Sequence, residues 1–132
     1  MSETCLLLRR ECIRQIGGFD ESFHSYTEDR DLGYRANDAG WGVGRLTTTK
    51  VTGLGSVIGD APAPIYRSNQ ILLSHKRGGS VAGWKYLMRE AAAGFWHALL
   101  SLRPGEHGRY HRMLAVRNVR VVRRAAVLLR RS

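Results

Sequence analysis

The chain has 132 residues, of which 43% are apolar and 24% are charged. This composition excludes a disordered tail, and the length excludes a complete two-site enzyme with appendages, because one ordinary domain takes roughly 100–150 residues. The net charge of +10 is unevenly distributed: residues 1–66 hold seven Lys and Arg against nine Asp and Glu, whereas residues 67–132 hold fourteen against two. The charge therefore divides the chain into two functional regions.

The cysteines and the apolar segments indicate the cellular compartment in which we expect the chain. Cys5 and Cys12 form no C-x-x-C pair and have no His at metal-ligand spacing, so we expect reduced thiols and neither a disulfide framework nor a zinc site. The first residues lack the basic region and apolar core of a signal peptide. The longest apolar stretch without a charge, Ala91 to Leu102, falls short of the roughly 20 residues that span a bilayer. These features predict a cytoplasmic chain without a transmembrane helix.

The first half of the chain predicts alternating strands and helices. A short apolar run begins almost at the first residue, and paired glycines after the next segment supply the left-handed position that ends a helix. A polar turn precedes a second helical pattern, which another glycine ends. In chain order we expect a strand at 5–8, a helix at 9–16, a helix at 28–39, a strand at 41–46, an extended segment at 47–51 and a loop at 53–64.

The second half predicts helices only. Residues 65–76, 81–102 and 108–131 are helical stretches, separated by Gly78-Gly79-Ser80 and by Pro104-Gly105. The last stretch is a basic amphipathic helix, because its arginines and its apolar residues occupy opposite bands at 100 degrees per residue. The arginines are Arg109, Arg112, Arg117, Arg120, Arg123, Arg124, Arg130 and Arg131; the apolar band holds Leu114, Val121, Val122, Ala125, Leu128 and Leu129.

The densest cluster of acids, Glu28-Asp29-Arg30-Asp31, stands at the start of the second predicted helix. By itself this arrangement is structural, because carboxylates in the first turn complement the positive end of the helix dipole by roughly 0.3–1 kcal/mol each. The surrounding residues add an ordered pattern. It runs through Leu8-Arg9-Arg10-Glu11, Gly17-Gly18-Phe19-Asp20-Glu21-Ser22-Phe23, Glu28-Asp29-x-Asp31-Leu32-x-x-Arg35 and Ala39-Gly40-Trp41.

Over roughly residues 5–56 this pattern resembles the family 2 glycosyltransferases of the bacterial rhamnosyltransferase type. The resemblance implies an α/β fold, a partial GT-A (Rossmann-like) sheet with flanking helices, followed here by a helical, basic C-terminal region. Residues 1–60 are then the C-terminal half of a GT-A domain, and residues 61–132 a helical, basic extension that associates with a membrane. The donor-binding N-terminal half is then encoded separately, or the chain is a truncated fragment.

The implied function is transfer of a sugar, with inversion, from a nucleotide-sugar donor to a glycan or lipid-linked acceptor in cell-envelope polysaccharide synthesis. Asp29, the second acid of the pair, is by the same resemblance the general base, and Glu28 supports it. Such a carboxylate must lie within hydrogen-bond reach of the acceptor hydroxyl. Asp31, Arg35 and Trp41 are candidate substrate-binding residues. An Asp31–Arg35 ion pair, helix capping by Asp31 and packing of Trp41 are the structural alternatives.

The resemblance also implies a divalent metal, Mg²⁺ or Mn²⁺, in the full-length family. Thr52 stands where relatives often place a His, and no D-x-D motif precedes the strand expected at 5–8. Since Thr is a poor ligand for a divalent cation, we assign no metal ligand.

The basic last helix predicts contact with an anionic membrane, peripheral at its cytoplasmic face, with Trp84, Tyr86, Phe95 and Trp96 as interfacial anchors. The alternative is that these helices pack against the catalytic domain and show a solvated basic face. A non-catalytic membrane-surface or partner module is the rival function. Nucleic-acid binding is disfavoured, because the chain lacks a helix-turn-helix partner and its acidic first half would repel the polymer.

Overall fold

The structure, a computed structural model, describes residues 6–23, 25–48 and 63–131. Cys5, Thr52 and most of the loop expected at 53–64 lie outside the described residues. The chain divides into two compact units, unit 1 from residue 1 to 59 and unit 2 from residue 60 to 132.

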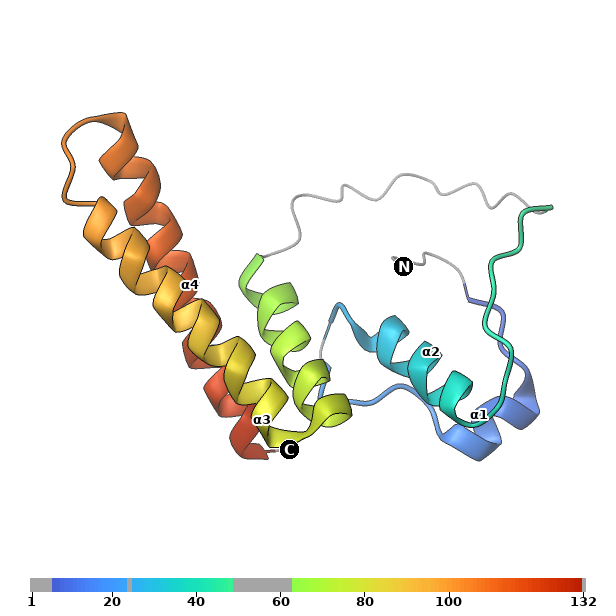
Figure 1. Cartoon of the computed structure of the whole chain (residues 1–132). Helices are drawn as coiled ribbons and strands as arrows, with labels where there is room; N and C mark the ends of the chain where they lie inside the picture. The colour runs from blue at the N-terminus through green and yellow to red at the C-terminus, as the bar shows by residue number, and fades with distance from the viewer. Residues whose placement is uncertain (1–5, 24, 49–62, 132) are drawn as a thin grey trace. The chain divides into compact units, whose positions relative to one another are not determined.

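The described residues of unit 1 form two short helices, α1 (Arg10–Ile16) and α2 (Glu28–Asp38) (Figure 1). Each helix ends beside a glycine, as the sequence predicts. Gly17 takes a φ of 79° after α1, and its N–H donates to the Ile13 carbonyl at 2.9 Å. After α2, Gly40 takes a φ of 84°, its N–H donates to Asn37, and the N–H of Trp41 donates to the Ala36 carbonyl at 2.9 Å. This is the Schellman pattern, which satisfies the last carbonyls of a helix.

The α/β fold expected for residues 1–60 is wrong for the described part of the chain. The four elements α1 to α4 are all helices, and the described residues form no strand and no sheet. The two segments predicted as strands are exposed, including the one predicted to be buried: Leu7 is 87% exposed, Val43 51% and Leu46 63%. A strand forms only where a neighbouring strand takes up its backbone hydrogen bonds, and neither segment finds such a partner among the described residues. A short apolar run in the sequence does not show whether a neighbouring strand is present to pair with it.

Unit 2 consists of α3 (Ala63–Leu100) and α4 (Glu106–Arg131). Gly79, with φ 75° and ψ 179°, breaks α3 into a first arm, residues 63–78, and a second arm, residues 80–100. The three helical stretches predicted for this half of the chain are therefore confirmed. Only glycine adopts this backbone conformation without strain, so Gly79 is what allows the two arms to fold back on each other.

The two arms of α3 and α4 lie side by side (Figure 1), and they share one apolar core. Its buried members are Ile71 from the first arm, Leu87 from the second arm, and Val121 and Ala125 from α4. Polar contacts join the same elements. Arg67 donates to both carboxylate oxygens of Glu90, at 3.0 and 2.9 Å. The buried amide of Asn118 donates to the Glu90 carbonyl at 3.4 Å. Unit 2 is thus a three-helix bundle with Glu90 at the junction of all three helices.

None of the helices in the described parts of the chain is both long and apolar enough to cross a membrane.

Replacing Gly79 with Ala tests whether the break in α3 sets the bundle. An alanine with this positive φ is strained, so we expect Gly79→Ala to lower the free energy of unfolding by about 1–3 kcal/mol. Chemical unfolding followed by circular dichroism measures the change. Val81→Ala is the control, because Val81 is 81% exposed and should shift stability by no more than about 0.5 kcal/mol. Equal midpoints for the two variants would contradict this role of Gly79.

Candidate functional site

The acids predicted to carry the chemistry begin α2, directly after a strained stretch of backbone. Tyr26 and Thr27 have φ angles of 65° and 86°, in the left-handed region that non-glycine residues rarely adopt. Thr27 is also buried and β-branched, for which a positive φ is a true outlier. Such conformations cost of order 1–3 kcal/mol each and cluster at functional sites. The strain here precedes Glu28 and Asp29 immediately.

Glu28 and Asp29 are half-buried rather than solvated. One oxygen of Asp29 accepts a hydrogen bond from the Arg30 N–H at 2.8 Å. The Oε2 atom of Glu28 is buried and has no hydrogen-bond partner among the described residues. A buried acceptor without a partner costs about 1–3 kcal/mol, so this oxygen is suited to a donor from outside the described structure, such as a substrate hydroxyl.

Asp31 and Arg35 form an ion pair, with Nε of Arg35 2.7 Å from Oδ2 of Asp31. The other two guanidinium nitrogens donate to backbone carbonyls at the end of α1. Nη1 reaches Ile16 at 2.8 Å and Nη2 reaches Gly18 at 2.9 Å. Arg35 therefore ties the middle of α2 to the C-terminal end of α1, where the carbonyls carry the negative end of the helix dipole. The contacts recorded for Arg35 are all within unit 1.

Trp41 makes a second tie to α1, because its Nε1–H donates to Oε1 of Gln15 at 2.8 Å. Of the predicted site residues, the structure brings Glu28, Asp29 and Asp31 together in the first turn of α2. Arg35 joins them through Asp31, whereas Trp41 follows the opposite end of the helix. Thr52, the remaining residue singled out in the sequence, lies outside the described residues.

The acids of α2 do not make up a metal site by themselves. Over residues 6–23, 25–48 and 63–131, no group of three or more His, Cys, Asp or Glu side chains could hold a metal ion.

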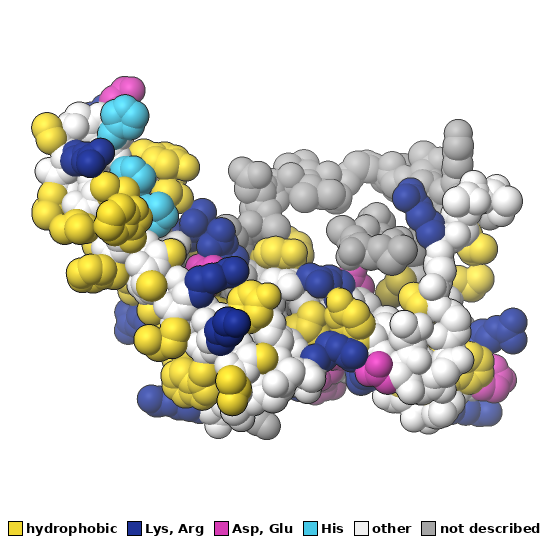
Figure 2. Space-filling model, in the orientation of Figure 1, with side chains coloured by type: hydrophobic (Ala, Val, Ile, Leu, Met, Phe, Trp, Pro, Cys, Tyr) yellow, Lys and Arg dark blue, Asp and Glu magenta, His cyan; other side chains and the backbone are white. Residues whose placement is uncertain are grey.

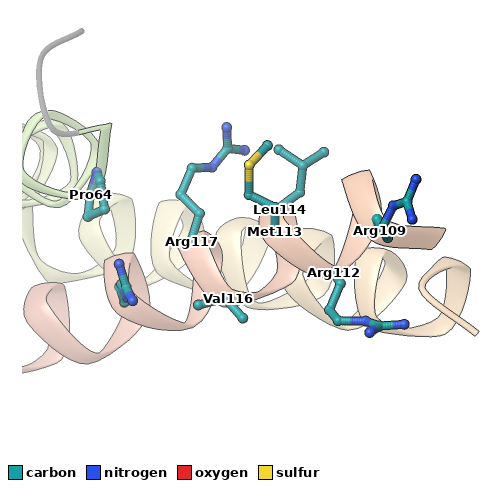
Figure 3. Close-up of a pocket in the computed structure, with 8 residues that line it drawn as sticks. Pro64, Arg109, Arg112, Met113, Leu114, Val116 and Arg117 are labelled. Carbon is teal, nitrogen blue, oxygen red and sulfur yellow. The ribbon is translucent and has the colours of Figure 1, made fainter. Parts of the chain in front are cut away.

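The basic face of α4 bears a shallow depression lined by Pro64, Arg109, Arg112, Met113, Leu114, Val116, Arg117 and Arg120. Figure 3 shows that Arg112 and Arg117 point away from each other rather than toward one centre. The arginines therefore spread positive charge over a surface, and this arrangement does not build a binding site for one small anion.

Comparison with known proteins finds a sequence match over part of the chain. A 41-residue segment supports a relationship to glycosyltransferases, with 54% identity to each of two relatives. Both are N-acetylglucosaminyl-diphospho-decaprenol L-rhamnosyltransferases of Mycobacterium tuberculosis, one from strain CDC 1551 / Oshkosh and one from strain ATCC 25618 / H37Rv. The segment is 31% of this chain and spans only 13% of each relative's length. No protein-family model matches the chain, and no solved structure matches it.

Two features of this region could not be predicted from the sequence. The left-handed backbone at Tyr26 and Thr27 has no sequence signal, because tyrosine and threonine are not residues that favour a positive φ. The reach of Arg35 to Ile16 and Gly18 depends on how α1 and α2 pack. The spacing of Asp31 and Arg35, by contrast, is the one at which ion pairs form on a helix, and the sequence offered that pair as an alternative.

Arg35→Lys tests the tie between α1 and α2. Lysine keeps the charge but lacks the planar fork that reaches three acceptors, so we expect a local loss of about 1–3 kcal/mol. Hydrogen exchange of the amides in residues 10–17 should then quicken by about tenfold or more. Arg45→Lys is the matched control, because Arg45 is exposed after α2. Unchanged exchange in Arg35→Lys would show that the tie contributes nothing to the packing of α1.

Proposed function

We propose that unit 1 supplies the acceptor-facing part of a sugar-transfer site, with Asp29 as the general base. The reaction is an inverting transfer of the family 2 type, from a nucleotide-sugar to a glycan or lipid-linked acceptor in cell-envelope polysaccharide synthesis. The observation that carries the proposal is the Glu28-Asp29 pair itself. It begins α2 directly after two strained residues, and it falls within the sequence pattern that resembles this family.

The chemistry assigned to Asp29 is the removal of one proton. As the acceptor oxygen attacks the anomeric carbon, its proton passes to the Asp29 carboxylate. The bond between that carbon and the diphosphate breaks on the opposite face, and the nucleoside diphosphate leaves with the electron pair. Attack from the face opposite the leaving group inverts the anomeric centre.

Glu28 is proposed to hold the acceptor sugar. Its Oε2 atom is a buried acceptor without a partner among the described residues, and a sugar hydroxyl is a donor of matching polarity. A hydroxyl bound there adjoins the neighbouring carboxylate of Asp29, which would orient the acceptor for proton removal.

Asp31, Arg35 and Trp41 are proposed to position the site rather than to bind substrate. The contacts of all three side chains support this assignment, because they join α2 and its C-terminal end to α1 or to one another. The first turn of α2 is thereby braced without using the Glu28 oxygen that remains unpartnered.

The donor nucleotide is proposed to bind to protein outside these 132 residues. This assignment is supported by the small share of the relatives that the chain spans, 13%. The proposed place of reaction is the cytoplasmic face of the membrane, where a soluble donor and a lipid-linked acceptor can meet.

Asp29→Asn tests the catalytic base. Residues 9–48 of this chain, grafted into the corresponding region of the mycobacterial rhamnosyltransferase, should leave that enzyme active. Asp29→Asn in the graft should then lower kcat by about 10²–10⁴-fold, the usual contribution of a general base, with little change in KM. Rhamnose transfer to the lipid-linked acceptor is the measurement.

The matched control is Glu21→Gln in the same graft, which removes a carboxylate from an exposed turn and should leave the rate unchanged within about twofold. An active graft whose rate is insensitive to Asp29→Asn would remove Asp29 from the catalytic role. It would leave a non-catalytic partner module as the better description of the chain.

Donor binding gives an independent check. Titration calorimetry of the full chain with dTDP-, UDP- and GDP-sugars should show binding that is weak or absent, since the donor site is proposed to lie elsewhere. A micromolar dissociation constant for any of them would overturn that part of the proposal and place a donor site within these 132 residues.

A further inference from the structure

The second arm of α3 exposes a continuous apolar face. Large apolar side chains recur along it at intervals of three, four or seven residues, so that they fall on one side of the helix. This apolar face consists of Val81, Trp84, Met88, Phe95, Leu99 and Leu102, the last just beyond the end of α3. Phe95 is 74% exposed and Leu102 is 79% exposed. The face runs the full length of the arm.

The core of the bundle does not account for this face, because the same arm packs inward through other residues. Leu87 is buried in the core, Gly83 lies against His75 of the first arm, and Gly94 lies against Asn118 of α4. A soluble protein rarely exposes an unbroken apolar surface of this kind without a partner for it.

The charges beside the apolar face indicate the chemistry of its partner. At 100 degrees per residue Lys85 and Arg89 lie next to it on the helix, and Arg103 directly follows Leu102; all three are exposed. Trp96 lies on the same flank and is 58% exposed. Figure 2 shows hydrophobic side chains over much of the visible surface of unit 2, with basic side chains among them. Apolar, aromatic and basic groups thus occur together.

The net charge of residues 67–132 further restricts the kind of partner that can bind the apolar face. Residues 67–132 hold fourteen Lys and Arg against two Asp and Glu. A second copy of the same surface would be repelled by this charge, and a nucleic acid would leave the apolar face uncovered. An anionic lipid bilayer matches both the apolar face and the positive charge. Apolar side chains insert at its acyl boundary, and arginine and lysine bind its phosphates.

The structure also shows which helix can enter the bilayer. The sequence predicts that the basic helix at 108–131 lies on the membrane by its own apolar band. In the bundle that band faces inward: Leu114, Val121 and Ala125 of α4 are buried. Its arginines Arg109, Arg112, Arg120, Arg123, Arg130 and Arg131 are exposed. Insertion by this band of α4 would require the bundle to open, whereas the apolar face of α3 is already exposed.

We propose that the apolar face of α3 is a docking surface for anionic lipid bilayers. Trp84, Phe95 and Leu99 enter the boundary between headgroups and acyl chains, while Lys85 and Arg89 bind lipid phosphates. The surface is a property of unit 2 and does not depend on the sugar transfer proposed for unit 1.

The test uses the full chain carrying Trp41→Phe, which leaves Trp84 and Trp96 as the only tryptophans. It is mixed with vesicles of phosphatidylcholine alone, or of phosphatidylcholine with phosphatidylglycerol. We expect sedimentation with the anionic vesicles only, a blue shift of tryptophan emission, and quenching by lipids brominated on the acyl chains. Sedimentation without quenching would overturn the proposal, because it would show attachment by charge alone.

A pair of double variants separates the apolar face from apolar surface in general. Phe95→Ser with Leu99→Ser should lower vesicle partitioning by about tenfold or more, because two buried apolar side chains are lost from the bilayer. Phe19→Ser with Leu46→Ser removes the same residue types from exposed positions in unit 1 and should change partitioning by less than about twofold. Circular dichroism checks that both variants keep the helical content of the parent.

Two outcomes would contradict the proposal that the apolar face docks on lipid. Equal partitioning of the two double variants would show that the apolar face does not contact lipid. A dimer in lipid-free sedimentation velocity that Phe95→Ser with Leu99→Ser dissociates would show that the face is an interface between copies of this chain. A monomer in both cases, with loss of vesicle binding only in the α3 variant, is the expected result.

Discussion

The described part of the chain is organised by the few residues at which its backbone turns left-handed. Gly17 and Gly40 end α1 and α2, Gly79 separates the two arms of α3, and Gly105 precedes α4. Glycine meets this requirement without steric cost, so α1, α2 and the first arm of α3 each end beside a glycine that permits the turn. The remaining left-handed residues, Tyr26 and Thr27, meet the requirement at a cost, and they precede the acids of α2. Backbone strain and the candidate site therefore coincide, as is common where structure serves function.

In unit 1 the strained turn and the Arg35 contacts act on the same helix. The guanidinium joins Asp31 to the carbonyls of Ile16 and Gly18, so that α2 is held against α1 through its last turn, about two turns beyond Glu28 and Asp29. Three charge-assisted hydrogen bonds at a partly buried site are enough to offset strain of a few kcal/mol. The result is a carboxylate pair at the start of a braced helix, with one glutamate oxygen left without a partner in the described structure.

In unit 2 the helix that buries its predicted apolar band is not the helix that exposes the apolar face. α4 buries Leu114, Val121 and Ala125 in the bundle and displays most of its arginines, whereas α3 displays Trp84, Phe95 and Leu99. A single amphipathic helix needs both faces at once to bind a bilayer, but a bundle can divide them between two helices and remain folded. This division lets the lipid-docking surface that we propose for α3 coexist with the buried core around Val121.

The sequence by itself determined the helices of both units and the position of the acids. Periodicity and the glycines at 17, 40 and 79 are local signals, and they predicted the helix limits to within a few residues. Only the tertiary structure decided the rest. Residues 6–8 and 41–46 have sequences that predict strands, but a strand needs a neighbouring strand to pair with, and the described residues contain none. The same reason applies to the three acceptors of Arg35 and to the exposed face of α3, because which side of a helix is covered depends on segments distant in the chain.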